Sequence, residues 1–265
     1  MRKRMICGAL AAMALPMPAA AAEAEETPIC TDRPTKANAV CTVPIGSWQL
    51  ESSAASWSKA EADGVETEAV TLGASVVKVG LSERSDLQIG MAPMVSVETE
   101  EAGEESRHLG AGDLTIRYKH RLTSDGATVQ VAAIPFVKIP TADGDIGNGK
   151  AEGGLAVPIS MAAGAVTVVL GPELDVLADA DGEGHHPALV NLVNVSGPVA
   201  PGVTLIGELW TMTNFDPADR VTQASADAAL AWLVSNRVQL DLGANLGLNR
   251  NTADVEVYVG ASVRF

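Results

Sequence analysis

Apolar and polar side chains alternate along the last thirteen residues of the chain, Ala253–Phe265. From Val255 onward, valines, one alanine and a closing phenylalanine hold the odd-numbered positions, whereas charged, hydroxyl, tyrosine and glycine residues hold the even-numbered ones. Because successive side chains of a β-strand point to opposite faces, this segment has one apolar and one polar face. At the edge of a soluble sheet such a strand is an aggregation hazard, whereas in a transmembrane barrel its apolar face meets lipid. This segment alone also fits a half-buried strand of a soluble β-sandwich.

The same alternation recurs along the chain from residue 46, and no segment shows a convincing helical period. The cleanest example is Val238–Asn249, in which valine, leucine and alanine oppose glutamine, aspartate, glycine and asparagine. We therefore expect about twelve strands. They are residues 46–58, 65–81, 87–98, 112–122, 127–140, 153–163, 165–179, 188–195, 203–215, 221–234, 238–249 and the terminal segment.

The connections between these strands alternate in length. Short turns are expected at 82–86, 123–126, 164, 196–202 and 235–237, and longer loops at 99–111, 141–152, 180–187 and 216–220, while 59–64 and 250–252 are also short. Outer-membrane barrels have short periplasmic turns, longer outer loops and an even number of strands. We therefore predict an all-β fold, a transmembrane antiparallel up-and-down β-barrel over residues 46–265, with a polar lumen and periplasmic termini.

Residues 1–22 have the pattern of a Sec-type signal peptide. Three basic residues, Arg2–Arg4, precede the apolar run Met5–Met17, and Ala20–Ala22 offers a small-residue cleavage site. The apolar run is too short to span a bilayer as a helix. We therefore expect export, and with it a location in the outer membrane of a Gram-negative type of envelope.

Residues 23–45 are polar and marked by prolines, and we expect them to form a periplasmic lead-in to the barrel. Cys30 and Cys41 are the cysteines that remain after signal removal, and an even pair in an exported protein predicts a disulfide. The sequence leaves open whether this segment enters the lumen as a plug or hangs below it.

The charge balance limits the partners of the chain. The full sequence carries a net charge of −15, and loss of the three basic signal residues shifts it to −18. Such a surface disfavours nucleic acid and electrostatic docking on anionic lipid heads. Although 47% of the residues are hydrophobic, no later run of 18 uncharged apolar residues exists, so any contact with membrane lipid must be made by strands.

Short motifs along the chain resemble those of the meta-pathway phenol-degradation family of outer-membrane proteins, which are often labelled transporters. The motifs are Thr31-Asp-Arg-Pro34, Thr42-Val-Pro-Ile-Gly46, Gln49-Leu-Glu51, Gly112-Asp-Leu-Thr115 with Lys119, and Ile139-Pro-Thr141 leading to Gly153-Gly-Leu155. The resemblance covers most of the mature chain. It implies a barrel of twelve or a similar number of strands and the passage of small organic molecules. It supplies no catalytic residues.

The polar face of the strands would line the lumen and form the solute path. By alternation it collects the acids Glu51, Glu98, Asp113, Glu173, Asp175, Glu208, Asp227, Asp241 and Glu256, and the bases Arg117, Lys119, Arg121, Lys138 and Arg264. Such charges either create a transverse field that selects solutes or form a paired network that fills a narrow lumen. The two readings are compatible.

Two loop sequences and one histidine have weak resemblances to chemical sites. Residues 144–151 nearly spell a phosphate-binding loop, but Ala151 replaces the hydroxyl residue that would hold Mg²⁺, and the glutamate of a calcium loop is also absent. His185 and His186, with acids at 179, 181 and 183, could bind a transition metal. His120 lies on the apolar face without a serine partner for lipid hydrolysis. We predict no enzyme activity, cofactor or metal, and the metal question stays open for the loop histidines.

We therefore predict an outer-membrane transporter or porin-like channel for small solutes, hydrophobic or aromatic ones included. The alternative is a non-transporting structural or surface-interaction barrel whose lumen is plugged by ion pairs. The predicted partners are outer-membrane lipid, a small-molecule solute and the barrel-assembly machinery, which would read the terminal aromatic residue Phe265 as its signal. The solute, the direction of passage and the oligomeric state, monomer or larger, are left open.

Overall fold

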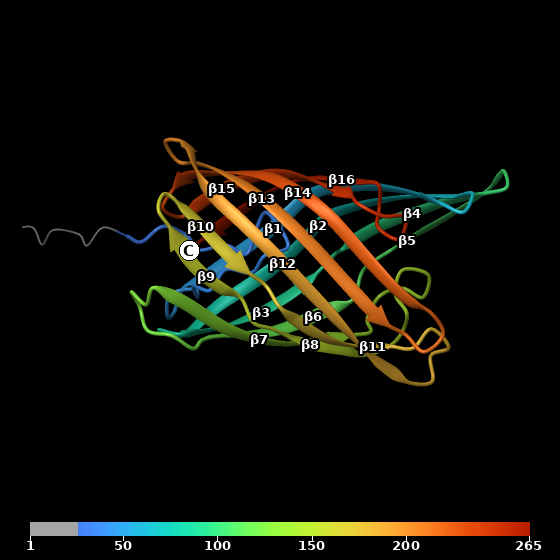
Figure 1. The fold of residues 1–265 in the computed structure, drawn as a ribbon, viewed down its shortest axis with the longest axis horizontal. Coiled ribbons are helices and arrows are strands. Elements are labelled where there is room, and N and C mark those ends of the chain that lie inside the picture. Colours follow the sequence, from blue (N-terminus) through green and yellow to red (C-terminus); the bar gives the residue numbers. More distant parts are fainter. Residues whose placement is uncertain (1–25) are drawn as a thin grey trace, which may run out of the picture.

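A computed structural model describes residues 26–265, and the predicted signal peptide lies outside the described residues. Sixteen strand segments form one antiparallel sheet that closes on itself (Figure 1). They are β1 (Trp48–Ala62), β2 (Val65–Ser82), β3 (Ser85–Met91), β4 (Met94–Glu101), β5 (Glu104–Gly110), β6 (Leu114–Arg121), β7 (Val129–Ile139), β8 (Glu152–Ala156), β9 (Ile159–Ala163), β10 (Val166–Leu170), β11 (Glu173–Ala178), β12 (His185–Ala200), β13 (Val203–Phe215), β14 (Arg220–Ser235), β15 (Val238–Gly247) and β16 (Val255–Arg264). Within residues 26–265, no helix has both the length and the hydropathy that a membrane span requires.

The sixteen segments amount to twelve barrel strands, because four of the crossings are interrupted. β3 and β4 are interrupted at Pro93, β8 and β9 at Pro158, and β10 and β11 at Pro172. Proline has no backbone N–H to donate to the ladder, so it breaks a strand locally. β5 and β6 form the fourth interrupted crossing. The prediction of a twelve-stranded antiparallel barrel is confirmed.

The barrel closes where β1 pairs with both β2 and β16. At the end of this seam the Phe265 N–H donates to the Trp48 carbonyl at 2.9 Å, and the Trp48 N–H donates back to the Phe265 carbonyl at 3.0 Å. Closure pairs the first and last strands, which matters because hydrocarbon offers backbone groups no alternative partner.

Side-chain alternation sorts the two faces of the wall as expected. On β12, Leu189 and Val193 are exposed on the outside, whereas Ala188 and Asn194 are buried inside. Large apolar residues are exposed on the other strands too, among them Leu72, Leu205 and Leu242, as a lipid-facing surface requires. The chain is therefore an outer-membrane β-barrel.

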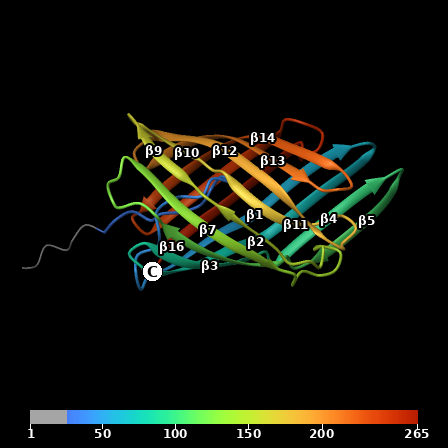
Figure 2. The ribbon, with the colours of Figure 1, turned by 60° about the horizontal axis from the view of Figure 1, so that its bottom comes forward.

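Both described ends of the chain lie at the end of the barrel that carries the short turns, and the longer loops lie at the opposite end (Figures 1 and 2). This is the polarity of an outer-membrane barrel with periplasmic termini. We call these the periplasmic and outer ends.

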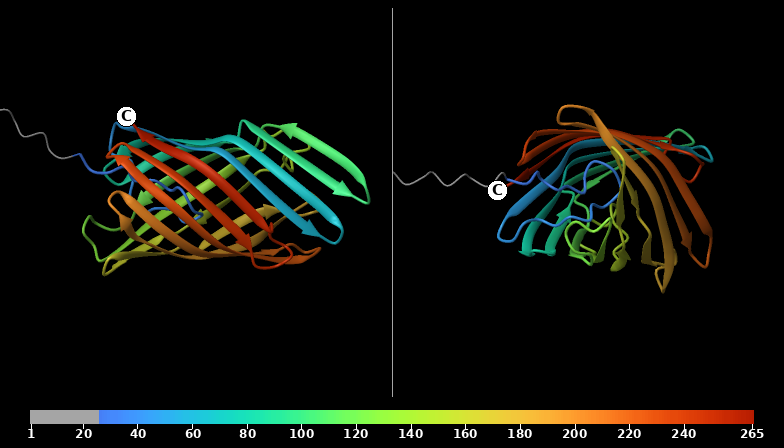
Figure 3. Two further views of the ribbon diagram at one scale, coloured as in Figure 1. Left: turned by 90° about the horizontal axis from the view of Figure 1, so that it is seen from above. Right: turned by 60° about the vertical axis from the view of Figure 1, so that its left-hand side comes forward.

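Two expected loops are wrong in detail. Residues 99–111, expected to be a long acidic loop, are mostly strand. β4 and β5 form a hairpin whose last pair is Glu101 and Glu104. The turn between them consists of Ala102 and Gly103, both at positive φ. This hairpin projects beyond the rest of the outer rim (Figure 3). Residues 196–202, expected to be a turn, continue β12 to Ala200. In both cases strand pairing with a neighbour overrides the local polar and proline-rich composition.

We predict that deletion of Phe265 impairs assembly of the barrel. The deletion removes the last reciprocal backbone pair of the β1–β16 seam and the exposed terminal aromatic side chain. The measurement is the fraction of folded, heat-modifiable protein in isolated outer membranes. Phe265→Tyr, which keeps an aromatic ring and the backbone pair, should assemble normally. Equal yields of the deletion variant and the wild type would contradict the prediction.

Candidate functional site

The chain segment that precedes the first strand enters the barrel (Figures 2 and 3). Residues 30–41, which we call the inner segment, are closed into a loop by the Cys30–Cys41 disulfide, with a Cα–Cα distance of 6.1 Å. The predicted disulfide is confirmed. Glu26, which precedes the disulfide, lies at the rim, where Arg237, chiefly by its hydrogen bond, lowers the pKa of the Glu26 carboxyl.

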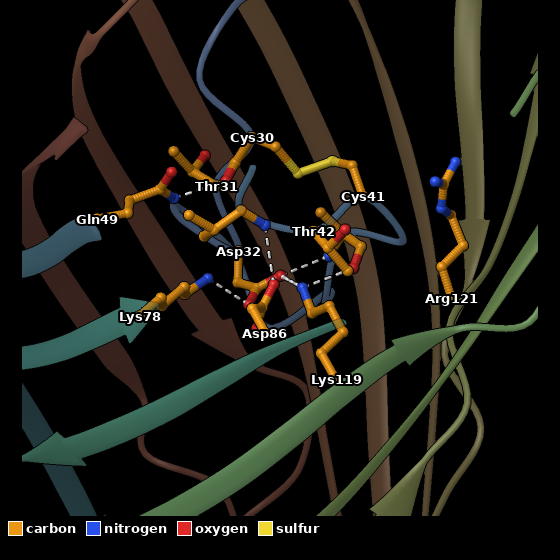
Figure 4. The surroundings of a disulfide bond; sticks show 12 residues. Cys30, Thr31, Asp32, Cys41, Thr42, Gln49, Lys78, Asp86, Lys119 and Arg121 are labelled. Atoms are coloured by element: carbon orange, nitrogen blue, oxygen red, sulfur yellow. Dashed lines mark hydrogen bonds and ion pairs between the residues drawn. A yellow bond between two sulfur atoms is a disulfide. The ribbon is translucent and has the colours of Figure 1, made fainter. Parts of the chain in front are cut away.

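Asp32 of the inner segment pairs with two lysines of the barrel wall (Figure 4). Lys78 of β2 and Lys119 of β6 each place Nζ 2.5 Å from a different Asp32 carboxylate oxygen. Lys78 Nζ also lies 2.5 Å from Glu51 of β1, whose carboxylate accepts the Asp32 backbone N–H at 3.1 Å. Both lysines are almost fully buried. Buried charges are tolerated when they are paired and hydrogen-bonded, and here the partner comes from the inner segment.

The opposite side of the inner segment carries the complementary charges. Arg33 donates two hydrogen bonds to Asp241 of β15, at 2.6 and 3.1 Å, which is the bidentate geometry of a strong charge-assisted pair. Lys36 Nζ lies 2.6 Å from Asp227 of β14. A side chain at position 260 would overlap the Arg33 guanidinium, so Gly260 permits this close approach.

Backbone and neutral groups complete the attachment. Glu208 of β13 accepts the backbone N–H groups of Lys36 and Ala37, both at 3.0 Å. Asn194 of β12 donates to the Thr35 hydroxyl at 3.0 Å, and Arg117 of β6 donates to the side chain of Asn38. The inner segment is therefore tied to β1, β2 and β6 on one side and to β12–β15 on the other.

The structure brings six of the predicted lumen residues together on the inner segment: Glu51, Arg117, Lys119, Glu208, Asp227 and Asp241. Arg264 instead contacts Glu26 and Thr27, which precede the segment at the rim. Sequence reasoning missed their partners Asp32, Arg33, Lys36 and Asn38. The available signal was the disulfide, which predicts a compact loop where an extended linker was expected.

The other predicted lumen residues lie apart from the inner segment. Lys138 bridges Asp113 at 3.2 Å and Glu152 at 2.7 Å toward the outer end. Glu256 accepts a hydrogen bond from Asn245 at 2.7 Å, and Arg121 pairs with Asp125 beside a periplasmic turn. The remaining three are Glu173 and Asp175, neighbours on β11, and Glu98, which is exposed on the projecting hairpin among other glutamates.

The inner segment divides the lumen into two cavities. One, of about 310 Å³, lies between the segment and a wall of β7, β9, β10 and β12–β15, and is lined by Val169, Ile206 and Ala231 together with polar residues of the periplasmic half. The other, of about 450 Å³, lies against β1, β2, β3 and β6 and reaches Asp113 and Arg117. Arg33, Thr35 and Asn38 line both cavities.

One sector of the inner wall is apolar although it faces the lumen. Its buried apolar residues are Ala132, Ile134, Ala156, Val169, Ala188, Val190, Leu192, Ile206, Ala229 and Ala231, from β7 to β14, and the same strands also bury Asp175, Asn194, Glu208 and Asp227. The charged contacts to the inner segment lie mainly on the other strands. The lumen is therefore richer in apolar side chains from β7 to β14 than on the other strands, a detail that the expectation of a polar lumen did not include.

Comparisons with known proteins agree with this architecture. The sequence model of a family described as "Putative MetA-pathway of phenol degradation" matches residues 31–265. An outer membrane channel from Pseudomonas putida F1 has a similar structure, with a TM-score of 0.66 and 14% identity over 85% of this chain and 98% of that one. The translocator domain of the autotransporter NalP from Neisseria meningitidis gives a TM-score of 0.49 and 15% identity over 85% of this chain and 91% of that one. A search of curated protein sequences found no match.

We predict that Asp32→Asn loosens the inner segment. The change leaves Lys78 and Lys119 without their shared counter-ion, and breaking a buried ion pair typically costs about 3–5 kcal/mol. The measurement is hydrogen–deuterium exchange of residues 31–41, which should accelerate by about a hundredfold or more. Asp63→Asn, in an exposed outer turn, is the control and should leave the exchange unchanged. Unaltered exchange in Asp32→Asn would show that the pair does not hold the segment.

Proposed function

Because this chain belongs to the family described as a MetA pathway of phenol degradation, we propose that it forms an outer-membrane channel for small solutes, with the inner segment setting what passes. The observation that carries the proposal is the pair of lumen cavities that share Arg33, Thr35 and Asn38 as lining residues. A solute that crosses the barrel would leave one cavity and enter the other past these side chains.

The form of the lumen favours uncharged solutes with an apolar part. Most of the wall charges near the inner segment are matched by a charge of opposite sign, so few are free to attract an ion. The apolar sector offers a surface to an aliphatic or aromatic group, and apolar pockets with a few polar groups are the usual form of small-molecule sites. Small hydrophobic or aromatic solutes are the class that we propose.

One similar barrel supports a passage role over an enzymatic one. The solved structure with the TM-score of 0.66 is titled an outer membrane channel. Within residues 26–265, no hydrogen bond joins a serine to a histidine, whereas a serine hydrolase would need such a nucleophile–base pair.

A specific observation favours a second candidate, the non-transporting barrel. Ion pairs on opposite sides of the inner segment and a disulfide that closes it could hold the lumen shut permanently. The barrel would then serve as a structural or surface-interaction protein. The two candidates differ in whether the native chain passes solutes at all.

Planar-bilayer conductance separates the two candidates. We expect the native protein to give small, measurable steps, and a variant lacking residues 26–41 to give larger ones because the cavities merge. If the shortened variant conducts and the native protein does not, the plugged barrel is correct. If neither conducts although both are folded, the channel proposal fails.

The solute class is tested by block of the native current with a small aromatic alcohol such as benzyl alcohol. Ile206 lines the cavity of about 310 Å³ between the inner segment and β7–β15. Ile206→Ala should therefore weaken the block by about threefold to tenfold, because the aromatic alcohol loses apolar contact. Leu205→Ala is the matched control, since Leu205 is the preceding residue of β13 but faces outward. Equal block in both variants would argue against binding of the aromatic group on the apolar sector.

A further inference from the structure

Three side chains with metal-binding atoms converge on the inner side of the outer rim, away from the inner segment. Asp179 follows β11, His186 is the second residue of β12, and Asp216 follows β13. His186 Nδ1 lies 2.7 Å from Asp179 Oδ1 and 3.6 Å from Asp216 Oδ2. Asp216 is distant in sequence, and the barrel places it here because β12 pairs with both β11 and β13.

Hydrogen bonding alone leaves this cluster incompletely satisfied. Nδ1 of a neutral imidazole carries at most one proton, so it can donate to Asp179 while Asp216 remains 3.6 Å away. Two carboxylates therefore face one imidazole nitrogen, and within residues 26–265 no lysine or arginine lies within 4.0 Å of either carboxylate. Lys150 donates to the Gly182 carbonyl of the adjoining turn at 2.7 Å and not to either carboxylate.

Burial and orientation also resemble those of a site. The His186 side chain is 3% exposed, and those of Asp179 and Asp216 are 17% and 10% exposed, so the cluster is enclosed but reachable from the outer opening. His186 Nε2 is buried without a hydrogen-bond partner. Asp216 Oδ2 accepts the Ala180 N–H at 2.8 Å, and Oδ1 accepts the Ala218 N–H at 2.7 Å, which fixes the carboxylate and leaves lone pairs toward His186.

We propose that Asp179, His186 and Asp216 bind a divalent transition-metal cation such as Zn²⁺ at the outer mouth of the barrel. One imidazole nitrogen and two carboxylate oxygens suit Zn²⁺ and its neighbours, and water would complete the coordination. The cation would neutralise the two carboxylates and tie the β11–β12 turn to the β13–β14 loop. Sequence reasoning grouped His185 and His186 with Asp179, Asp181 and Glu183, and it missed Asp216. Of that group, the structure brings only His186 and Asp179 together with Asp216. His185 bonds to the Ala151 carbonyl at 3.0 Å, and the Asp181 carboxylate accepts the Glu183 backbone N–H at 2.9 Å.

The test uses the purified full-length mature barrel, without a histidine tag and stripped with a chelator, in detergent. Isothermal titration with Zn²⁺ should give about one bound ion per chain, and Co²⁺ should produce visible absorption bands from a nitrogen- and oxygen-ligated site. His186→Gln and Asp216→Asn should each weaken Zn²⁺ binding by about tenfold or more. His185→Gln is the matched control, and His108→Gln controls for the His108–Asp145 pair. Both should bind as the wild type does.

Heat-dependent mobility in gels establishes that each variant is folded. Absence of stoichiometric Zn²⁺ binding to the wild type would overturn the proposal whatever the variants do. The three side chains would then serve only to connect the two loops by hydrogen bonds. Binding that persists in folded His186→Gln but disappears in His108→Gln or His185→Gln would also overturn it, because the ion would belong to another histidine.

Discussion

The requirement that every backbone N–H and C=O within the bilayer find a partner determines the rest of this structure. Hydrocarbon supplies no hydrogen bonds, so the sheet must close on itself, as β1 and β16 do. Closure gives the wall an outside that must be apolar and an inside that need not be. The strict alternation along the strands follows from this, and it sends Glu51, Lys78, Lys119, Glu208 and Asp241 into the lumen.

Charges in a narrow lumen need counter-ions or water, and the chain supplies many of the counter-ions itself. The inner segment presents Asp32 to the lysines of β2 and β6, and Arg33 and Lys36 to the aspartates of β15 and β14. The two interpretations of the lumen charges, a selecting field and a paired network, therefore apply together. The ion pairs form chiefly between the barrel wall and the inner segment. The proposed solute path is the part of the lumen that the inner segment does not fill. The disulfide keeps this set of charges on one short loop.

The fold could be predicted because its signals are local. Alternation identifies a strand from ten residues or so, and loop lengths assign its direction, so the strand number, the closing strand and the disulfide are all correct. The errors arise where pairing with another strand determines the secondary structure. Residues 99–111 have the composition of a polar loop, but most of them form strand because β4 and β5 pair with each other. The contacts of the inner segment carry no local signal at all. Arg33 and Asp241 are separated by 208 residues, and only the closed barrel brings them together. The same holds for Asp216, which joins His186 through strand pairing.

The most direct test of the account is whether the inner segment occupies the lumen of the native protein in a membrane. Thr35 and Asn194 are in hydrogen-bond contact at 3.0 Å although 159 residues separate them. Cysteines at these two positions should be joined efficiently by a short bifunctional thiol reagent in intact outer membranes, and the product should be recognised by its altered mobility after unfolding. Pairing Thr35→Cys with Val193→Cys, the adjacent lipid-facing position, should give no product. Failure of the Thr35–Asn194 pair to cross-link in a folded barrel would contradict the placement of the segment and the channel account built on it.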